Sequence, residues 1–146
     1  MSEPPHTYDT APVAERMTDH VPHAASLGMT LTAMEKGRGT MTTPWREELV
    51  GDPETGVIAS GVVTALIDHT CGLAISSACE TPQPIATLDL RIDYLRAAGP
   101  GRGITAEAHC YKLSRSIGFV RAQAWDVDSS DLVATAQATF MLNPRG

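Results

Sequence analysis

The sequence GVIASGVVTALIDHTCGLA, residues 56–74, is the longest stretch of low charge in the chain. After Ala59-Ser60-Gly61 its apolar residues recur with the spacing of a helix rather than with the alternation of a strand. A single acidic residue, Asp68, lies inside this run, about two turns into the expected helix. Burial of a carboxylate costs free energy unless a partner or a reaction uses it. Asp68 is therefore the first candidate functional residue.

Composition sets limits on what the protein is. The chain has 146 residues, 42% of them hydrophobic and 19% charged, which suits one domain with its own core. Its formal net charge of −6 argues against general binding of nucleic acid or membrane surfaces, because both need a basic surface. Its three cysteines form no C-x-x-C pair or Cys/His cluster, so we predict neither disulfides nor a metal site. No targeting segment and no run of about 18 apolar residues is evident, so we expect a soluble, cytoplasmic protein.

The pattern of helix and strand signals predicts an α+β fold. Residues 1–24 are predicted to form an arm and a short helix interrupted at Pro22. Two strand-like segments precede a polar loop over 46–56, which leads into the central helix at Ser60. Four more strand-like segments follow the helix and are predicted to form an antiparallel meander. The six segments cover residues 28–35, 39–45, 85–95, 104–113, 117–127 and 132–142.

Alanines at alternating positions in the last three segments predict that a sheet wraps closely around the helix. Small side chains on one face of a sheet let a helix approach it, and one helix against about six antiparallel strands is an α+β layer architecture. In segment 85–95 the alternation places Leu88, Leu90 and Tyr94 on one face and Thr87 and Asp89 on the other. The alanines are Ala106, Ala108, Ala122, Ala124, Ala134, Ala136 and Ala138.

One side of the predicted helix carries residues suited to acyl transfer. At about 100° per residue, Ser60, Thr64 and Asp68 share a side, and Thr64 is expected to hydrogen-bond the Asp68 carboxylate. The first backbone N–H groups of a helix have no partner inside it, so those of Ser60 and Gly61 can bind an oxygen that becomes negative during a reaction. An oxyanion donor and a carboxylate on one helix indicate a candidate catalytic site.

Three other residues of the predicted helix are interpreted without a catalytic role for their side chains. His69 projects about 100° away from Asp68, so we interpret it as a packing or solvated residue rather than as a dyad partner. Cys71 has no histidine placed to activate it and is interpreted as a small buried thiol. Ser60 lacks the first glycine of a G-x-S-x-G elbow, which argues against a serine nucleophile.

Three segments occur together and in order: residues 51–68 with the acidic residue near the helix centre, a T-x-D-x-x-x-x-Y-L-R strand at 87–96, and an A-x-A-x-x-x-F strand at 134–140. In this combination the chain resembles the hotdog-fold acyl-CoA thioesterases of the phenylacetic-acid-degradation type. The resemblance covers about residues 25–143 and implies a hotdog domain over 25–146. It also implies a homodimer that joins two sheets and pairs into a tetramer, with acyl-CoA sites at the subunit interface.

The resemblance implies roles for individual residues. Asp68 matches the carboxylate that activates water or attacks the thioester, and Thr87 matches a hydroxyl residue that helps to orient the water. The helix in this family usually begins His-Gly-Gly, where the amide after the histidine polarises the thioester carbonyl. Those three positions are Ala59, Ser60 and Gly61 here, so the histidine is absent.

Further differences bear on the substrate pocket. The asparagine usual in the family is replaced by Asp52, which predicts a more acidic pocket, and His23 is a candidate to replace the missing histidine. Coenzyme A carries phosphates, so we expect cations and hydrogen-bond donors near the mouth of the site. The candidates are Arg91, Arg96, Lys112, Arg115 and Ser116.

The leading hypothesis is hydrolysis of an acyl-CoA thioester to a free acid and coenzyme A, without a metal or a bound cofactor. The alternative is a non-catalytic acyl-CoA-binding protein that lost efficient hydrolysis together with the histidine. A hotdog-type enoyl-CoA hydratase is less favoured, because that chemistry pairs the aspartate with a histidine about five residues on, where this chain has Leu73.

Overall fold

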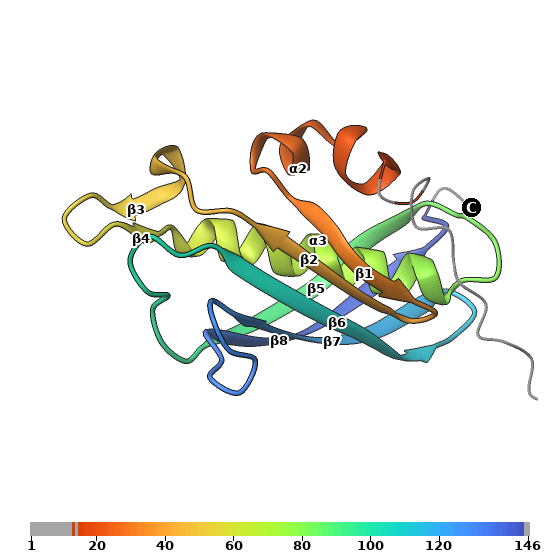
Figure 1. Cartoon of the computed structure of the whole chain (residues 1–146). Coiled ribbons are helices and arrows are strands. Elements are labelled where there is room, and N and C mark those ends of the chain that lie inside the picture. The colour runs from red at the N-terminus through yellow and green to blue at the C-terminus, as the bar shows by residue number, and fades with distance from the viewer. Residues whose placement is uncertain (1–12, 14, 145–146) are drawn as a thin grey trace, which may run out of the picture.

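The structure, a computed structural model, describes residue 13 and residues 15–144. A six-stranded antiparallel sheet curves around one long helix, α3 (Ser60–Ala78), which confirms the predicted α+β hotdog architecture (Figure 1). The strands are β1 (Thr30–Glu35), β2 (Arg38–Thr43), β5 (Ile85–Tyr94), β6 (Ile104–Leu113), β7 (Ile117–Trp125) and β8 (Ala134–Leu142).

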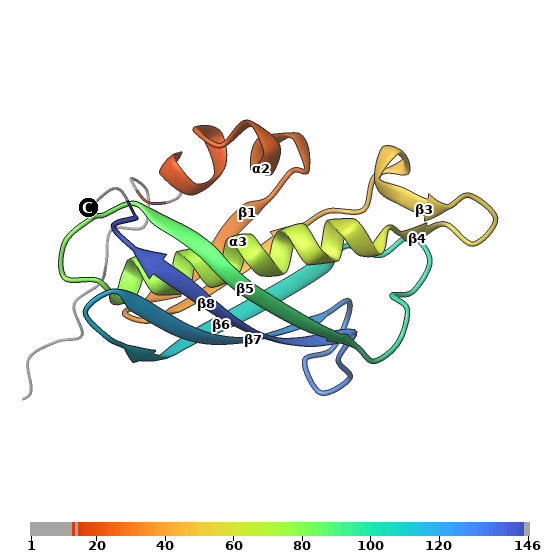
Figure 2. The same cartoon turned by 180° about the vertical axis from the view of Figure 1, so that it is seen from behind.

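The strand order across the sheet is β1-β2-β6-β7-β8-β5. Strands β6, β7 and β8 form a meander, but β5 pairs with β8 and β6 pairs with β2. The prediction that all four C-terminal strands form one meander is therefore wrong for β5. The reason is the path of the chain: α3 crosses the inner face of the sheet and delivers the chain to the far edge, where β5 begins (Figure 2).

The N-terminal helix is interrupted as the sequence predicts. A π-helical turn, η1 (Glu15–Asp19), is followed by α2 (Pro22–Ser26), which has Pro22 in its first turn. A nitrogen of the half-buried His69 ring lies against the Met17 carbonyl, which ties η1 to α3 and gives His69 a packing role. The arm predicted for residues 1–12 lies outside the described residues.

Residues 46–56 are more ordered than a loop. They contain a 3-10 turn, η2 (Glu47–Leu49), and a small hairpin formed by β3 (Val50–Asp52) and β4 (Val57–Ile58). The loop prediction is wrong here because Leu49 and Ile58 are buried and give the hairpin an apolar anchor. The hairpin lies at the N-terminal end of α3 (Figure 1).

The core lies between α3 and the inner face of the sheet. Leu66, Ile67 and Leu73 of α3 are fully buried, and the seven alternating alanines of β6, β7 and β8 are buried beneath them, as predicted. Gly39 and Gly118 extend this surface of small residues: a Cβ added at either would lie 2.5 Å from a side-chain atom of α3. The sheet therefore accommodates the helix at close range.

By length and mean hydropathy α3 is apolar enough to cross a membrane, although it is not an unbroken run of apolar residues. Of the 18-residue apolar stretch within α3, 56% is buried inside the folded chain. Such burial is typical of the core helix of a folded domain, because the apolar face of α3 packs against the sheet.

A β-bulge in β5 determines which side chains face α3. The register with β8 shifts between Thr87, which pairs with Phe140, and Asp89, which pairs with Thr139. Phe140 is buried against the helix, so Thr87 also lies on the helix face, and Leu88 is 51% exposed. The alternation predicted for this strand is therefore wrong up to and including Leu88, because the bulge adds one residue and reverses the faces.

Candidate active site

Asp68 and Thr87 meet between α3 and β5. The Thr87 hydroxyl donates a hydrogen bond of 2.8 Å to Asp68 Oδ1. Within the described part of the chain the Asp68 carboxylate makes no other hydrogen bond, so its second oxygen is available to a water molecule. Asp68 is only partly buried. The structure thus brings together the two residues that the sequence assigned to activation and orientation of water.

Cys71, less than one turn after Asp68, is fully buried. Burial, and secondarily the charge of Asp68, raise the pKa of the Cys71 thiol to about 12. The thiol therefore stays protonated at neutral pH and is not a nucleophile. This agrees with its interpretation as a small buried thiol.

Thr64 does not bond to Asp68, and that prediction is wrong. Its hydroxyl donates to the Ser60 carbonyl at 3.1 Å and lies 2.5 Å from the Tyr94 hydroxyl. A threonine hydroxyl within a helix commonly bonds the carbonyl four residues earlier, and Thr64 takes this local acceptor in place of the carboxylate.

Tyr94 is a site residue that sequence reasoning missed. Its hydroxyl donates to the Ser60 carbonyl at 2.9 Å and so connects the end of β5 to the first turn of α3. The alternation of β5 placed Tyr94 only on an apolar face. The available signal was its phenolic hydroxyl, which needs a partner wherever the ring packs against a helix.

The first turn of α3 presents free backbone donors. The Val62 N–H donates to the Ala59 carbonyl. By contrast, the Ser60 and Gly61 amides make no hydrogen bond within the described residues, and a Cβ added at Gly61 would meet no atom within 4 Å. Unpartnered amides at the positive end of a helix are suited to hold an oxyanion. Gly61 and Asp68 are seven residues apart, or about 10 Å along the helix axis.

The positions that differ from the family pattern lie at the β3–β4 hairpin. The Ala59 N–H donates to the Leu49 carbonyl at 2.8 Å, and Ala59 packs so closely on Gly51 that a Cβ there would lie 2.9 Å from the Ala59 Cα. The exposed Asp52 carboxylate accepts the Glu54 N–H at 3.0 Å and so stabilises the hairpin turn. His23 is exposed on α2, and α2 as a helix lies apart from the β3–β4 hairpin (Figure 1).

Arg96, one of the residues predicted to bind phosphate, is paired with two carboxylates of the same chain. Its guanidinium bonds Asp126 at 2.6 Å and Asp131 at 3.1 Å, and Asp126 also accepts the Gly99 N–H at 2.8 Å. The hydrogen bond from Arg96 is the main reason that the pKa of Asp126 lies well below its usual range. The same bond raises the pKa of Arg96. This network anchors the connection between β5 and β6.

The remaining predicted phosphate ligands do not gather at the first turn of α3. Arg91 is exposed on the outer face of the sheet and lies 3.5 Å from Asp93. Lys112 lies over the Phe119 ring, 5.7 Å from its centre. Arg115 and Ser116 are exposed in the turn between β6 and β7, at the C-terminal end of α3 (Figure 1). Within one chain these residues are separate from Ser60 and Gly61.

Comparison with known proteins identifies relatives along most of the chain. A family described as the thioesterase superfamily matches residues 55–133, which include α3, β5, β6 and β7. The medium/long-chain acyl-CoA thioesterase YigI of Salmonella typhimurium is 27% identical over 145 residues, covering 89% of this chain and 91% of that protein.

Two solved structures share the fold. A Pseudomonas aeruginosa protein is 32% identical with a TM-score of 0.80, and the match covers 88% of this chain and 95% of that one. A mutant of the phenylacetic acid degradation protein PaaI from Thermus thermophilus is 26% identical with a TM-score of 0.71, covering 83% and 98% of the two chains.

Proposed function

This chain belongs to the thioesterase superfamily, and from that premise we propose that it hydrolyses an acyl-CoA thioester with Asp68 as the catalytic carboxylate. Membership of the family confirms the resemblance found in the sequence and the assignment to thioester hydrolases. The observation that supports the role of Asp68 is its 2.8 Å hydrogen bond from Thr87, which fixes one carboxylate oxygen and leaves the other for the reaction.

In the proposed reaction Asp68 acts as general base. It takes a proton from water, and the water oxygen attacks the carbonyl carbon of the thioester. The resulting oxyanion is stabilised by the Ser60 and Gly61 N–H groups. The tetrahedral intermediate then collapses, the carbon–sulfur bond breaks, and the coenzyme A sulfur takes the proton from Asp68. A direct attack by the carboxylate, with a mixed anhydride that water later hydrolyses, is the second form of this proposal. Neither form uses a metal or a bound cofactor.

The spacing of residues along α3 limits how one substrate can contact both the Gly61 amide and the Asp68 carboxylate. The axial separation of about 10 Å between Gly61 and Asp68 is reduced because side chains on a helix slope toward its N-terminus. A water about 3 Å from the carboxylate and a carbonyl oxygen about 3 Å from the amide then fill most of the remaining distance. This arrangement suits a general base that acts through water better than it suits direct attack.

We also propose a homodimer formed through β5. This strand has ten residues, and among the described residues its one neighbour in the sheet is β8, so its other edge presents backbone groups that no described strand pairs. Leu88 in β5 and Leu95, the residue directly after this strand, are 51% and 59% exposed. Long apolar edges of this kind pair readily with a second chain. Pairing here would place the partner beside Thr87 and Asp68, as expected for a site at a subunit interface.

The second candidate function is acyl-CoA binding without efficient hydrolysis. It is favoured by Ala59, whose side chain offers neither a proton nor a hydrogen bond where the family has a histidine. Under this alternative the pocket persists and turnover is absent.

The test is release of free thiol by the full-length protein from aromatic, medium-chain and long-chain acyl-CoAs. The name of the Salmonella typhimurium relative makes the medium and long chains the first choice. We expect saturable turnover of at least one substrate. Rates equal to the protein-free rate for every substrate, together with saturable binding by calorimetry, would establish the binding protein instead.

A further inference from the structure

One side of α3 is left uncovered by the sheet and carries the proposed active site. Its residues are exposed or partly exposed, whereas the residues between them are buried in the core. At about 100° per residue they fall within one half of the helix circumference. We refer to them as the open strip of α3, which consists of Ser60, Gly61, Thr64, Ala65, Asp68 and His69.

Two segments flank the open strip. Strand β5 lies along one flank, where its side chains contact Thr64 and Asp68. His69 projects about 140° away from Thr64 and about 100° away from Asp68, so it lies on the opposite flank, where its ring contacts the Met17 carbonyl of η1. Both views show η1 on the side of α3 that faces away from the sheet, over the C-terminal half of the helix (Figure 1, Figure 2). A group bound against Asp68 therefore lies between β5 and η1.

The open strip ends directly after His69. Every residue of α3 from 70 to 75 is buried. Gly72, one turn after Asp68, continues the line of the strip, but a Cβ added there would lie 3.4 Å from Ile85 Cδ1 and 3.7 Å from Phe140 Cε1. Met17 of η1 is also partly buried against the core. The strip therefore has a closed, apolar end beside Asp68.

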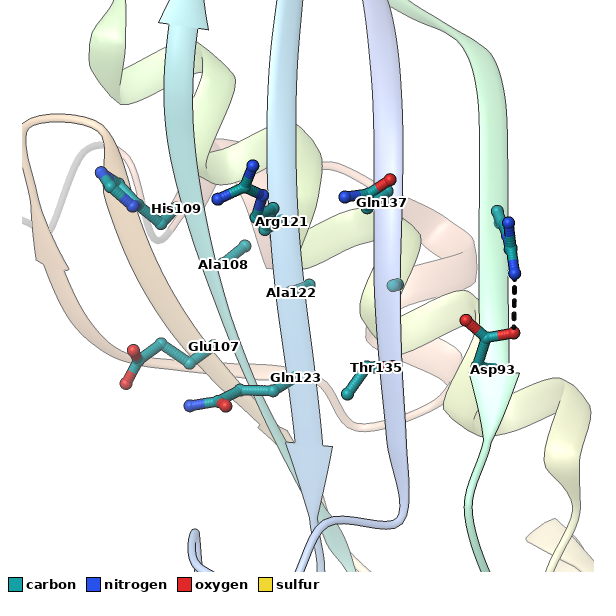
Figure 3. A pocket seen from close by; sticks show the side chains of 11 residues that line it. Asp93, Glu107, Ala108, His109, Arg121, Ala122, Gln123, Thr135 and Gln137 are labelled. Atoms are coloured by element: carbon teal, nitrogen blue, oxygen red, sulfur yellow. Dashed lines mark hydrogen bonds and ion pairs between the residues drawn. The ribbon is translucent and has the colours of Figure 1, made fainter.

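The hollow on the outer face of the sheet is not an alternative place for an acyl group bound at Asp68. It has a volume of about 540 Å³ and is lined mainly by polar and charged side chains (Figure 3). Its floor is the backbone at Ala108, Ala122 and Ala136, whose side chains are buried on the helix side of the sheet. The sheet thus separates this hollow from Asp68.

The two ends of the open strip differ in polarity, which gives the substrate a direction. In the proposed reaction the thioester carbonyl lies between the Gly61 amide and the Asp68 carboxylate. Coenzyme A is charged and stays at the exposed end, where Ser60 and Gly61 face solvent. The acyl group is apolar, and its burial at the apolar end is favourable. The acyl group is therefore directed past Asp68 toward η1.

We propose that η1 limits the length of the acyl group that the site accepts, and that His69 is the positioning residue that holds η1 in place. The inference rests on the proposed function, because it takes the acyl-CoA site at Asp68 as its starting point. Since η1 is a single turn of five residues, its hydrogen bond to α3 contributes strongly to fixing its position.

The sequence of η1 explains why its contact with α3 is made by a carbonyl. The N–H groups of His20 and Val21 donate to other carbonyls of η1, and Pro22 has no N–H to offer. The following residues thus leave the Met17 carbonyl to a side-chain donor. The ring nitrogen of His69 donates to it from α3. Pro22 and His69 together make η1 a wall fixed to the helix rather than the start of a longer helix.

The test measures by calorimetry how the full-length protein binds non-hydrolysable S-alkyl-CoA thioethers of increasing chain length. Affinity of the wild type should rise about four-fold for each added methylene up to a limiting length, and then rise no further. His69→Phe keeps a ring and removes the donor, so the limit should move to longer chains. Affinity for the first analogues beyond the wild-type limit should then increase by roughly ten-fold, which corresponds to about two more buried methylenes.

Two further variants separate the hydrogen bond from a general loss of structure. His69→Gln retains an N–H donor and should keep the wild-type limit. His109→Phe, the same change at a half-buried histidine on the outer face of the sheet, is the matched control and should also keep it (Figure 3). Circular dichroism checks the fold of each variant, and His69→Ala replaces His69→Phe if the latter does not fold.

A wild type without a limiting length would overturn the proposal, and so would a folded His69→Phe or His69→Ala with an unchanged limit. Because the analogues are not hydrolysed, the result does not depend on turnover. Hydrolysis of acyl-CoA with an unmoved limit would refute this inference alone. A moved limit in a protein without turnover would refute the hydrolytic function alone, and binding of no analogue by any variant would refute both.

Discussion

The hydroxyl of Thr87 on β5 donates a hydrogen bond to the carboxylate of Asp68 on α3, across 19 residues of sequence. The contact depends on the bulge at Leu88, because regular alternation would put Thr87 on the same outward face as Asp89. A local irregularity in an edge strand thus orients the candidate catalytic group.

Replacement of Thr87 tests how much this hydrogen bond contributes to the rate of acyl-CoA hydrolysis. Thr87→Val keeps the shape of the side chain and removes the donor, and a hydrogen bond to a charged group is worth about 1.5–3 kcal/mol. We therefore expect kcat for acyl-CoA hydrolysis to fall by roughly 10- to 100-fold. Thr87→Ser, which retains the hydroxyl, is the matched control and should recover most of the rate. Equal kcat for Thr87→Val and the wild type would show that the contact has no role in the reaction.

Tyr94→Phe removes the hydroxyl that binds the Ser60 carbonyl. Because Tyr94 is 46% exposed and its ring remains, we expect little change in the thermal unfolding midpoint. Without this hydrogen bond the Ser60 and Gly61 amides are held less firmly, which should cost about 0.5–1.5 kcal/mol of transition-state stabilisation, so kcat should fall by roughly 2- to 10-fold with a smaller change in KM. A drop in stability with unchanged kcat would assign Tyr94 to the fold alone.

Asp126→Asn tests the structural role of the Arg96 network. The Asp126 side chain is 4% exposed and bonds Arg96 at 2.6 Å. This change removes a charge-assisted hydrogen bond and leaves Arg96 with Asp131 as its carboxylate partner, so we expect the free energy of unfolding in urea to fall by about 1.5–3 kcal/mol at pH 7. Asp128→Asn, in the neighbouring exposed turn, is the control and should change stability by less.

The same pair predicts how stability depends on pH. The pKa of Asp126 is lowered in the folded protein, mainly by Arg96, so its contribution is present above the unfolded value of about 3.9. That contribution is lost as the pH falls toward the folded pKa. The difference in unfolding free energy between wild type and Asp126→Asn should therefore shrink from pH 7 to pH 3. A difference that stays constant over this range would contradict the lowered pKa.

The sequence predicted those features that depend on local patterns. The apolar helical run located α3, its single carboxylate identified Asp68, and the alternating alanines of β6, β7 and β8 predicted the close approach of helix and sheet. The resemblance to a known family then supplied Thr87, which alternation alone had placed on the wrong face.

The features that sequence reasoning missed depend on distant partners. The sequence did not show that Arg96 is paired with a carboxylate, because its partner Asp126 lies 30 residues further along the chain. Pairing with β8 sets the bulge in β5, and the path of α3 across the sheet sets the place of β5 at the edge. Thr64 differs, since a local acceptor, the Ser60 carbonyl, outcompeted the predicted one.

The central claim is that Asp68 catalyses thioester hydrolysis, and Asp68→Asn tests it most directly. Asparagine keeps the size of the side chain and its hydrogen bond with Thr87 but cannot accept a proton from water. With the best acyl-CoA substrate, thiol release should slow by roughly 10²- to 10⁴-fold. Asp89→Asn, an exposed aspartate on the outer face of the same strand as Thr87, should retain the wild-type rate. Equal rates for Asp68→Asn and the wild type would contradict the claim.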